Sequence, residues 1–156
     1  MATKKKSWRE KLNDSKDLPR VEVIDDRMSK RWGTGTFVIP APIEVDEIMR
    51  RVPKGKLITI SEIRQKLAEK HGATIGCPLT TGIFAWIAAN AADEALSSGE
   101  KNITPYWRTL KSGGVLNEKY PGGIEGQRKL LENEGFKVVQ KGKKCAVADF
   151  EKYLYT

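Results

Sequence analysis

Residues 79–97 constrain the fold more than any other stretch of this chain, because they combine a helical composition with almost no charge. The stretch is rich in alanine, and its only charged residues are Asp93 and Glu94. Alanine has the highest intrinsic helix propensity, so we expect one long helix here. A helix that is uncharged over most of its length needs a neighbour to cover it. The sequence therefore predicts a helix that either packs against the rest of the fold or lies very close to a partner.

A second predicted helix stands just before this one. Thr59 and Glu62 form the T-x-x-E pattern of a capping box, and Gly72 is suited to end the helix. Its inward-facing residues recur at helical spacing: Ile60, Ile63 and Leu67. A short loop with Cys77 and Pro78 then leads into the alanine-rich helix. Two helices joined in this way, the second of them long, indicate a helix-turn-helix.

The remaining elements are shorter. We expect a strand at 36–40, a helix at 44–52, an extended piece at 57–60, a helix at 122–135, a hairpin from 136 onward and a short helix at 149–155. The tip of the hairpin is basic, with Lys141, Lys143 and Lys144. A helix-turn-helix followed by a basic hairpin is typical of a winged helix, so the predicted fold class is mainly α with small β elements.

Two segments are expected along the chain. Residues 1–35 mix charges densely and show weak periodicity, which predicts a mobile, basic N-terminal arm that docks through Trp8 and Trp32. Residues 36–156 form the winged-helix-like domain. The expected boundary lies where the first clear strand begins.

Composition excludes several classes of protein and favours one class of partner. The 156 residues carry a net charge of +8, which favours a polyanion such as nucleic acid, although many basic proteins bind none. No apolar run is long enough to span a bilayer and no signal peptide is visible, so we expect a cytoplasmic protein with no membrane partner. With two distant cysteines and a single histidine, neither a metal site nor a cofactor is expected.

Several motifs occur in an order that resembles a known family. Residues 52–63 read V-P-K-G-K-L-I-T-I-S-E-I, residues 105–108 read P-Y-W-R, and residues 120–135 read Y-P-G-G-I-E-G-Q-R-K-L-L-E-N-E-G. With the alanine-rich helix between them, they resemble the DNA-binding domain of the O6-alkylguanine-DNA alkyltransferase family. The resemblance covers about residues 44–137 and implies a winged-helix-like fold of the alkyltransferase C-terminal type.

The resemblance also assigns roles to individual residues. In the family's P-C-H-R motif the cysteine accepts the alkyl group, and this position falls on Tyr106. The histidine of the motif falls on Trp107 and its arginine on Arg108. The glutamate that helps to activate the cysteine falls on Glu134, and a tyrosine that lines the pocket falls on Tyr120. A phenol with a pKa of about 10 stays protonated at neutral pH and cannot replace a thiolate. We therefore expect no alkyl transfer, with Arg108 and Glu134 supporting the loop.

A non-enzymatic branch of the family, the alkyltransferase-like proteins, binds alkylated guanine without repairing it. The resemblance to this branch implies a monomeric sensor of double-stranded DNA, alkylated or not, that signals to a repair protein. Tyr106, Trp107 and Tyr120 are the expected pocket, with Tyr106 at its floor and Trp107 closer to the core. Expected DNA contacts are Lys54, Lys56, Arg64, Lys66, Gly82, Ala85, Ala89 and Lys111.

Two departures from the family keep alternatives open. The helix at 79–97 has no arginine to fill the gap left by a flipped base, and Ile60 stands where the family has a phosphate-rotating tyrosine. One alternative is an alkyltransferase-family enzyme with residual or different methyltransferase activity, for example through Cys77. The other is a scaffold whose pocket binds a protein or a small ligand.

Overall fold

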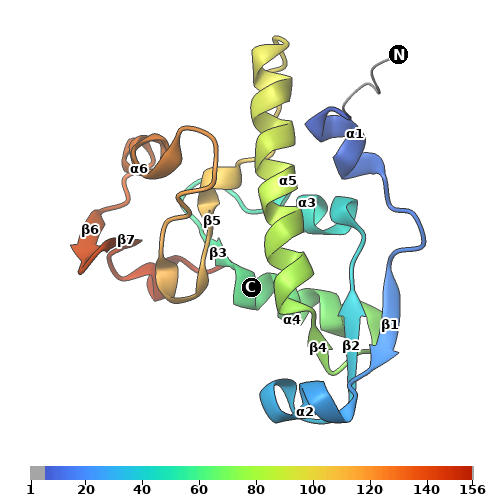
Figure 1. The fold of residues 1–156 in the computed structure, drawn as a ribbon. Helices are drawn as coiled ribbons and strands as arrows, with labels where there is room; N and C mark the ends of the chain where they lie inside the picture. Colours follow the sequence, from blue (N-terminus) through green and yellow to red (C-terminus); the bar gives the residue numbers. More distant parts are fainter. Residues whose placement is uncertain (1–5, 156) are drawn as a thin grey trace.

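A computed structural model describes residues 6–155 of the chain. Its centre is the long helix α5 (Pro78–Ser97), with α3 (Pro42–Arg50), α4 (Ile60–His71) and the short α1 (Trp8–Asn13) packed around it (Figure 1). The alanines on one side of α5 are buried among side chains such as Val45 and Met49. Small side chains let the neighbouring helices approach closely, so this side of α5 belongs to the core.

The predicted helix-turn-helix is present in α4 and α5. Thr59 precedes α4, and both its backbone N–H and its hydroxyl donate to the Glu62 carboxylate, at 2.9 and 2.7 Å. Gly72 ends the helix in the left-handed conformation, with φ of 65°. The connection to α5 contains the short strand β4 (Ile75–Gly76). The caps that the sequence predicted are therefore confirmed.

The segment before residue 36 adds elements that the sequence analysis did not predict. Strand β1 (Arg20–Val23) pairs antiparallel with β2 (Thr36–Ile39), and β2 pairs in parallel with β4. Helix α2 (Asp26–Trp32) lies between the two antiparallel strands in the chain. The first five residues of the expected N-terminal arm lie outside the described residues. The mobility expected of the arm stays a prediction.

Both tryptophans of this segment make aromatic contacts with the domain. The ring of Trp8 meets Trp86 of α5 edge-on, with centroids 4.8 Å apart, and Trp32 meets Phe37 of β2 at 5.2 Å. The backbone N–H groups of Trp8 and Arg9 donate to the carboxylate of Glu94 on α5. These bonds satisfy donors at the start of α1 that have no partner within the helix.

The C-terminal half forms a second layer beside α5 (Figure 1). Strand β3 (Ile58–Thr59) pairs in parallel with β5 (Thr109–Leu110), and helix α6 (Gly123–Asn133) precedes the hairpin of β6 (Val138–Lys141) and β7 (Lys144–Val147). Three short 3₁₀ helices complete it: η1 (Tyr106–Arg108), η2 (Ser112–Gly114) and η3 (Phe150–Tyr153). The last of these replaces the longer helix expected at 149–155. The predicted fold class, mainly α with small β elements and a wing-like hairpin, is confirmed.

The end of the described chain returns to the connection between α3 and α4. The N–H of Leu57 donates to the carbonyl of Tyr153 at 2.8 Å, and the N–H of Tyr155 donates to the carbonyl of Leu57 at 2.7 Å. Leu57 itself is fully buried in a second apolar cluster, together with Leu110, Leu116 and Leu131. The C-terminal residues are thus part of the domain.

Candidate functional site

Tyr106 lies in η1, where it is almost entirely buried, with 6% of its surface exposed. Its ring meets Trp107 and Tyr120 edge-on, with centroids 5.4 and 5.7 Å away. Burial raises the pKa of the Tyr106 phenol, and the negative charge of Asp93 raises it further. The hydroxyl therefore stays protonated at neutral pH. It cannot act as a nucleophile in the way that a thiolate would.

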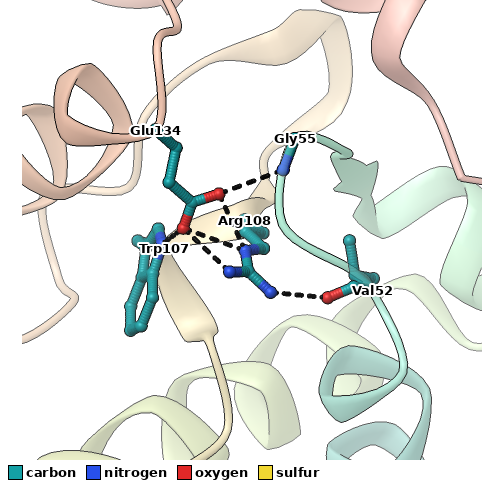
Figure 2. A network of polar contacts seen from close by, with 5 residues as sticks. All are labelled: Val52, Gly55, Trp107, Arg108 and Glu134. Atoms are coloured by element: carbon teal, nitrogen blue, oxygen red, sulfur yellow. Dashed lines mark hydrogen bonds and ion pairs between the residues drawn. The ribbon is translucent and has the colours of Figure 1, made fainter.

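A network of polar contacts surrounds the next two residues of the loop (Figure 2). The indole N–H of Trp107 donates to Oε2 of Glu134 at 2.6 Å. The guanidinium of Arg108 contacts the same carboxylate through Nε at 3.0 Å and Nη2 at 2.9 Å, and its Nη1 donates to the carbonyl of Val52 at 2.8 Å. The N–H of Gly55 adds a contact to Oε1 of Glu134 at 3.3 Å. The network joins η1, α6 and the connection between α3 and α4.

This network cannot activate a nucleophile. An indole N–H donates but has no lone pair to accept a proton, so Trp107 cannot take protons from position 106. Burial alone would raise the pKa of Glu134, but the hydrogen bonds from Arg108, Trp107 and Gly55 outweigh it and hold this pKa below its usual range. Glu134 is therefore an anion with its acceptors occupied. In this arrangement Arg108 and Glu134 hold the loop in place.

A hollow of about 450 Å³ lies beside the first turns of α5, and we call it the α5 hollow. Its apolar wall comes from α5 and the start of α4: Ile60, Pro78, Leu79, Gly82, Ile83 and Trp86. Its polar wall comes from the loop before α6: Lys111, Asn117, Glu118 and Lys119. The indole N–H of Trp86 joins the two walls by donating to the carbonyl of Lys119 at 3.1 Å. Tyr106, Trp107 and Tyr120 are not among the residues that line the α5 hollow.

Comparison with solved structures identifies the architecture. A crystal structure of the S. pombe protein ATL in complex with DNA superposes with a TM-score of 0.53 and 18% sequence identity, covering 74% of this chain and 94% of that one. The chain has the alkyltransferase-like fold. A crystal structure of S. pombe Atl1 in complex with damaged DNA containing O6-carboxymethylguanine matches with a TM-score of 0.48 and 20% identity, over the same shares of the two chains. No family model and no curated protein matches the sequence.

The alkyltransferase-like fold brings some of the expected DNA-contact residues together and separates others. Gly82 and Lys111 both line the α5 hollow, where Lys111 also pairs with Glu118 at 2.9 Å. Ala85 and Ala89 are fully buried in the core, so neither can touch a partner directly. The correction has a simple cause: the face of α5 that carries these alanines belongs to the main apolar core.

The other expected cations lie on different elements. Lys54 and Lys56 are exposed on the connection between α3 and α4. Arg64 donates to the carbonyl of Gly76 at 2.9 Å, and the Lys66 ammonium lies 5.5 Å from the centroid of the Tyr155 ring. Arg64 and Lys66 thus have partners within the fold, whereas Lys54 and Lys56 form no ion pair with another described residue.

Several residues of the α5 hollow were missed by the sequence analysis. The sequence does contain a signal for Leu79 and Ile83. These two large apolar residues stand four apart, with a glycine between them, on an uncharged helical stretch, so they share one face of the helix. The sequence contains no comparable signal for the polar wall of the hollow, because its position depends on how the loop before α6 folds back onto α5. That wall includes Asn117, Glu118 and Lys119. Among residues 6–155, no helix is long and apolar enough to cross a membrane, and no three potential ligand side chains gather to hold a metal ion.

Proposed function

We propose that this protein binds double-stranded DNA through the surface around the α5 hollow and senses a damaged base without repairing it. The observation that carries the proposal is the α5 hollow itself, an open, largely apolar site between the helix-turn-helix and the loop before α6. Two further facts support it. A structural neighbour with this fold is a complex with DNA, and the chain carries a net charge of +8.

The α5 hollow suits an extruded nucleobase. Its volume of about 450 Å³ lies within the range of small-ligand sites. Trp86 offers an aromatic surface, while Asn117 and Lys119 offer polar groups for the edge of a base. Stacking on an aromatic side chain stabilises a bound base by about 1–3 kcal/mol, which is comparable with the few kcal/mol needed to flip it out of the duplex. Flipping is therefore energetically reasonable at this site.

The aromatic cluster of Tyr106, Trp107 and Tyr120 keeps a role in the proposal as the buried support of the lesion site. Tyr106 does not line the α5 hollow, so its supporting role rests on the edge-on contacts of its ring with Trp107 and Tyr120 and not on its hydroxyl. Tyr106→Phe removes only this hydroxyl. We expect little loss of stability and an unchanged preference for alkylated DNA, measured by competition between duplexes, because the ring contacts remain. A smaller preference would show that the Tyr106 hydroxyl contacts the base, and it would place the base outside the α5 hollow.

Alkyl transfer is not part of the proposed function, because no thiol lies at the site. Cys77 is buried in an apolar cluster with Ile24 and Phe37, and Cys145 lies in β7 of the hairpin. After incubation with DNA that carries O6-methylguanine, mass spectrometry should show an unchanged protein mass. A gain of one methyl group would establish the enzyme alternative instead.

Binding should be measured with plain and O6-methylguanine duplexes at 50 and 200 mM salt. Contacts to about four phosphates would weaken binding about a hundredfold between these two salt concentrations. Lys119→Glu, at the α5 hollow, should weaken binding, whereas Lys129→Glu, exposed on α6, serves as a control of equal charge change. Absence of binding at low salt would overturn the DNA claim. Equal affinity for both duplexes would overturn lesion sensing alone.

The proposal extends to the setting in which the protein acts. A sensor that does not repair DNA needs a repair protein to read its complex, and we propose such a partner. We further propose that it binds as a monomer and is cytoplasmic, associated with the nucleoid if the cell is bacterial. Crosslinking on damaged and undamaged duplexes would test for the partner, which should appear only with damage.

A further inference from the structure

Two large apolar side chains project from the first turns of α5. Leu79 is 70% exposed and Ile83 is 43% exposed. They stand four residues apart and therefore lie on the same face of the helix. Gly82 leaves a gap beside them, because a Cβ atom at this position would meet no atom within 4 Å. The surface thus consists of two projecting apolar groups next to a flat stretch of helix.

The surroundings of these two side chains indicate what they contact. Both line the α5 hollow, and the opposite wall carries Lys111, Glu118 and Lys119. Lys111 pairs with Glu118 at 2.9 Å, so Lys119 leaves this wall with one net positive charge. Residues 78–92 of α5 carry no charged side chain. A single exposed leucine is ordinary on a protein surface, but a pair at the mouth of an apolar hollow marks a contact surface. Because the wall facing this surface is net positive, its partner combines an apolar interior with a negatively charged exterior, which describes stacked bases between phosphates.

We propose that Leu79 and Ile83 form an apolar wedge that enters the base stack of duplex DNA next to a base held in the α5 hollow. This inference rests on the proposed function and adds the residues that open the duplex. Leucine and isoleucine are among the side chains that partly unstack base steps when DNA-binding proteins insert them. Leu79 leads the wedge because it is the more exposed of the two, and Ile83 packs behind it. Lys119 across the hollow contacts an adjacent phosphate.

The wedge predicts a change in base stacking that phosphate contacts alone would not cause. A duplex with 2-aminopurine at its centre reports unstacking as an increase in fluorescence. The wild-type protein should raise the fluorescence on binding. Leu79→Ala should bind about tenfold more weakly and lose most of the increase, because it removes buried apolar surface but no charge. The dependence of its affinity on salt should match that of the wild type.

Leu96→Ala is the matched control, because Leu96 is 53% exposed at the opposite end of the same helix. This variant should bind and raise the fluorescence as the wild type does, and circular dichroism should show both variants folded. If the wild type binds DNA but Leu79→Ala retains its affinity and fluorescence, the wedge is overturned and the proposed function stands. A shallower salt dependence for Leu79→Ala would also overturn the wedge. If the wild type binds no DNA at low salt, the proposed function fails and the wedge fails with it.

Discussion

Replacing Glu134 with alanine tests whether the network in Figure 2 stabilises the fold. The change leaves the largely buried Arg108 guanidinium without its counterion, and it removes the acceptor of the Trp107 indole N–H. Breaking a buried ion pair by removing one partner costs about 3–5 kcal/mol. Arg108 keeps its bond to the carbonyl of Val52 and some access to water, so we expect the lower end, about 3 kcal/mol.

Urea unfolding at pH 7 measures this loss directly. Glu132→Ala is the matched control: Glu132 is on the same helix and makes only an exposed pair with Arg128 at 3.3 Å. Its loss should stay within about 0.5 kcal/mol. Combining Glu134→Ala with Trp107→Phe should show a coupling energy of about 1–2 kcal/mol, because the two side chains share a hydrogen bond. A cost below about 1 kcal/mol for Glu134→Ala would refute the argument.

The same variant predicts a change in the response to acid. The pKa of Glu134 is lower in the folded protein than its ordinary value of 4.5, because the contacts with Arg108, Trp107 and Gly55 outweigh burial. Its stabilising contribution is therefore complete above pH 4.5 and is lost as the pH falls through the folded value. The wild type should lose stability more steeply than Glu134→Ala below this pH. Equal slopes for the two proteins would contradict the assigned pKa direction.

Two further predictions concern residues outside the network. Gly114→Ala should lower the free energy of unfolding in urea by about 2–4 kcal/mol, because the φ of Gly114 is +78° and a Cβ would lie 2.5 Å from the Phe150 ring. Gly113→Ala is the control: its φ is +82°, but a Cβ would meet only Val115, at 4.0 Å, so it should cost about 1 kcal/mol. Similar costs for the two would show that the Phe150 contact is unimportant. Trp8→Ala should cost about 2–3 kcal/mol by removing the contact with Trp86, and an unchanged stability would mean that α1 adds nothing to the fold.

The helix-turn-helix could be predicted because its signals are local. Thr59, Glu62 and Gly72 mark the ends of α4 within a few residues, and the composition of 79–97 favours a helix without reference to the rest of the chain. Tyr106, Trp107 and Tyr120 were assigned through the family resemblance, which implied a pocket, and their packing against one another is seen only in the structure. The caps and the long helix depend on backbone preferences and on residues close in sequence, so the sequence alone reveals them.

The N-terminal elements and the α5 hollow could not be predicted in the same way. Strand β1 exists through pairing with β2, and α1 is held by Glu94 and Trp86, more than seventy residues away. The walls of the α5 hollow meet only when the loop before α6 closes onto α5. Ala85 and Ala89 were expected at the surface because small side chains suit both close helix packing and close approach to DNA, and composition does not separate the two.

The pairing of Leu57 with Tyr153 and Tyr155 bears on how the protein is made. During synthesis on a ribosome, α3, α4 and α5 emerge well before the residues that complete the hydrogen bonds of Leu57. The connection between α3 and α4 therefore stays incomplete until almost the whole described chain has left the exit tunnel. A nascent chain stalled before residue 150 would expose the apolar surface around Leu57, and chaperones that bind apolar segments would bind this surface.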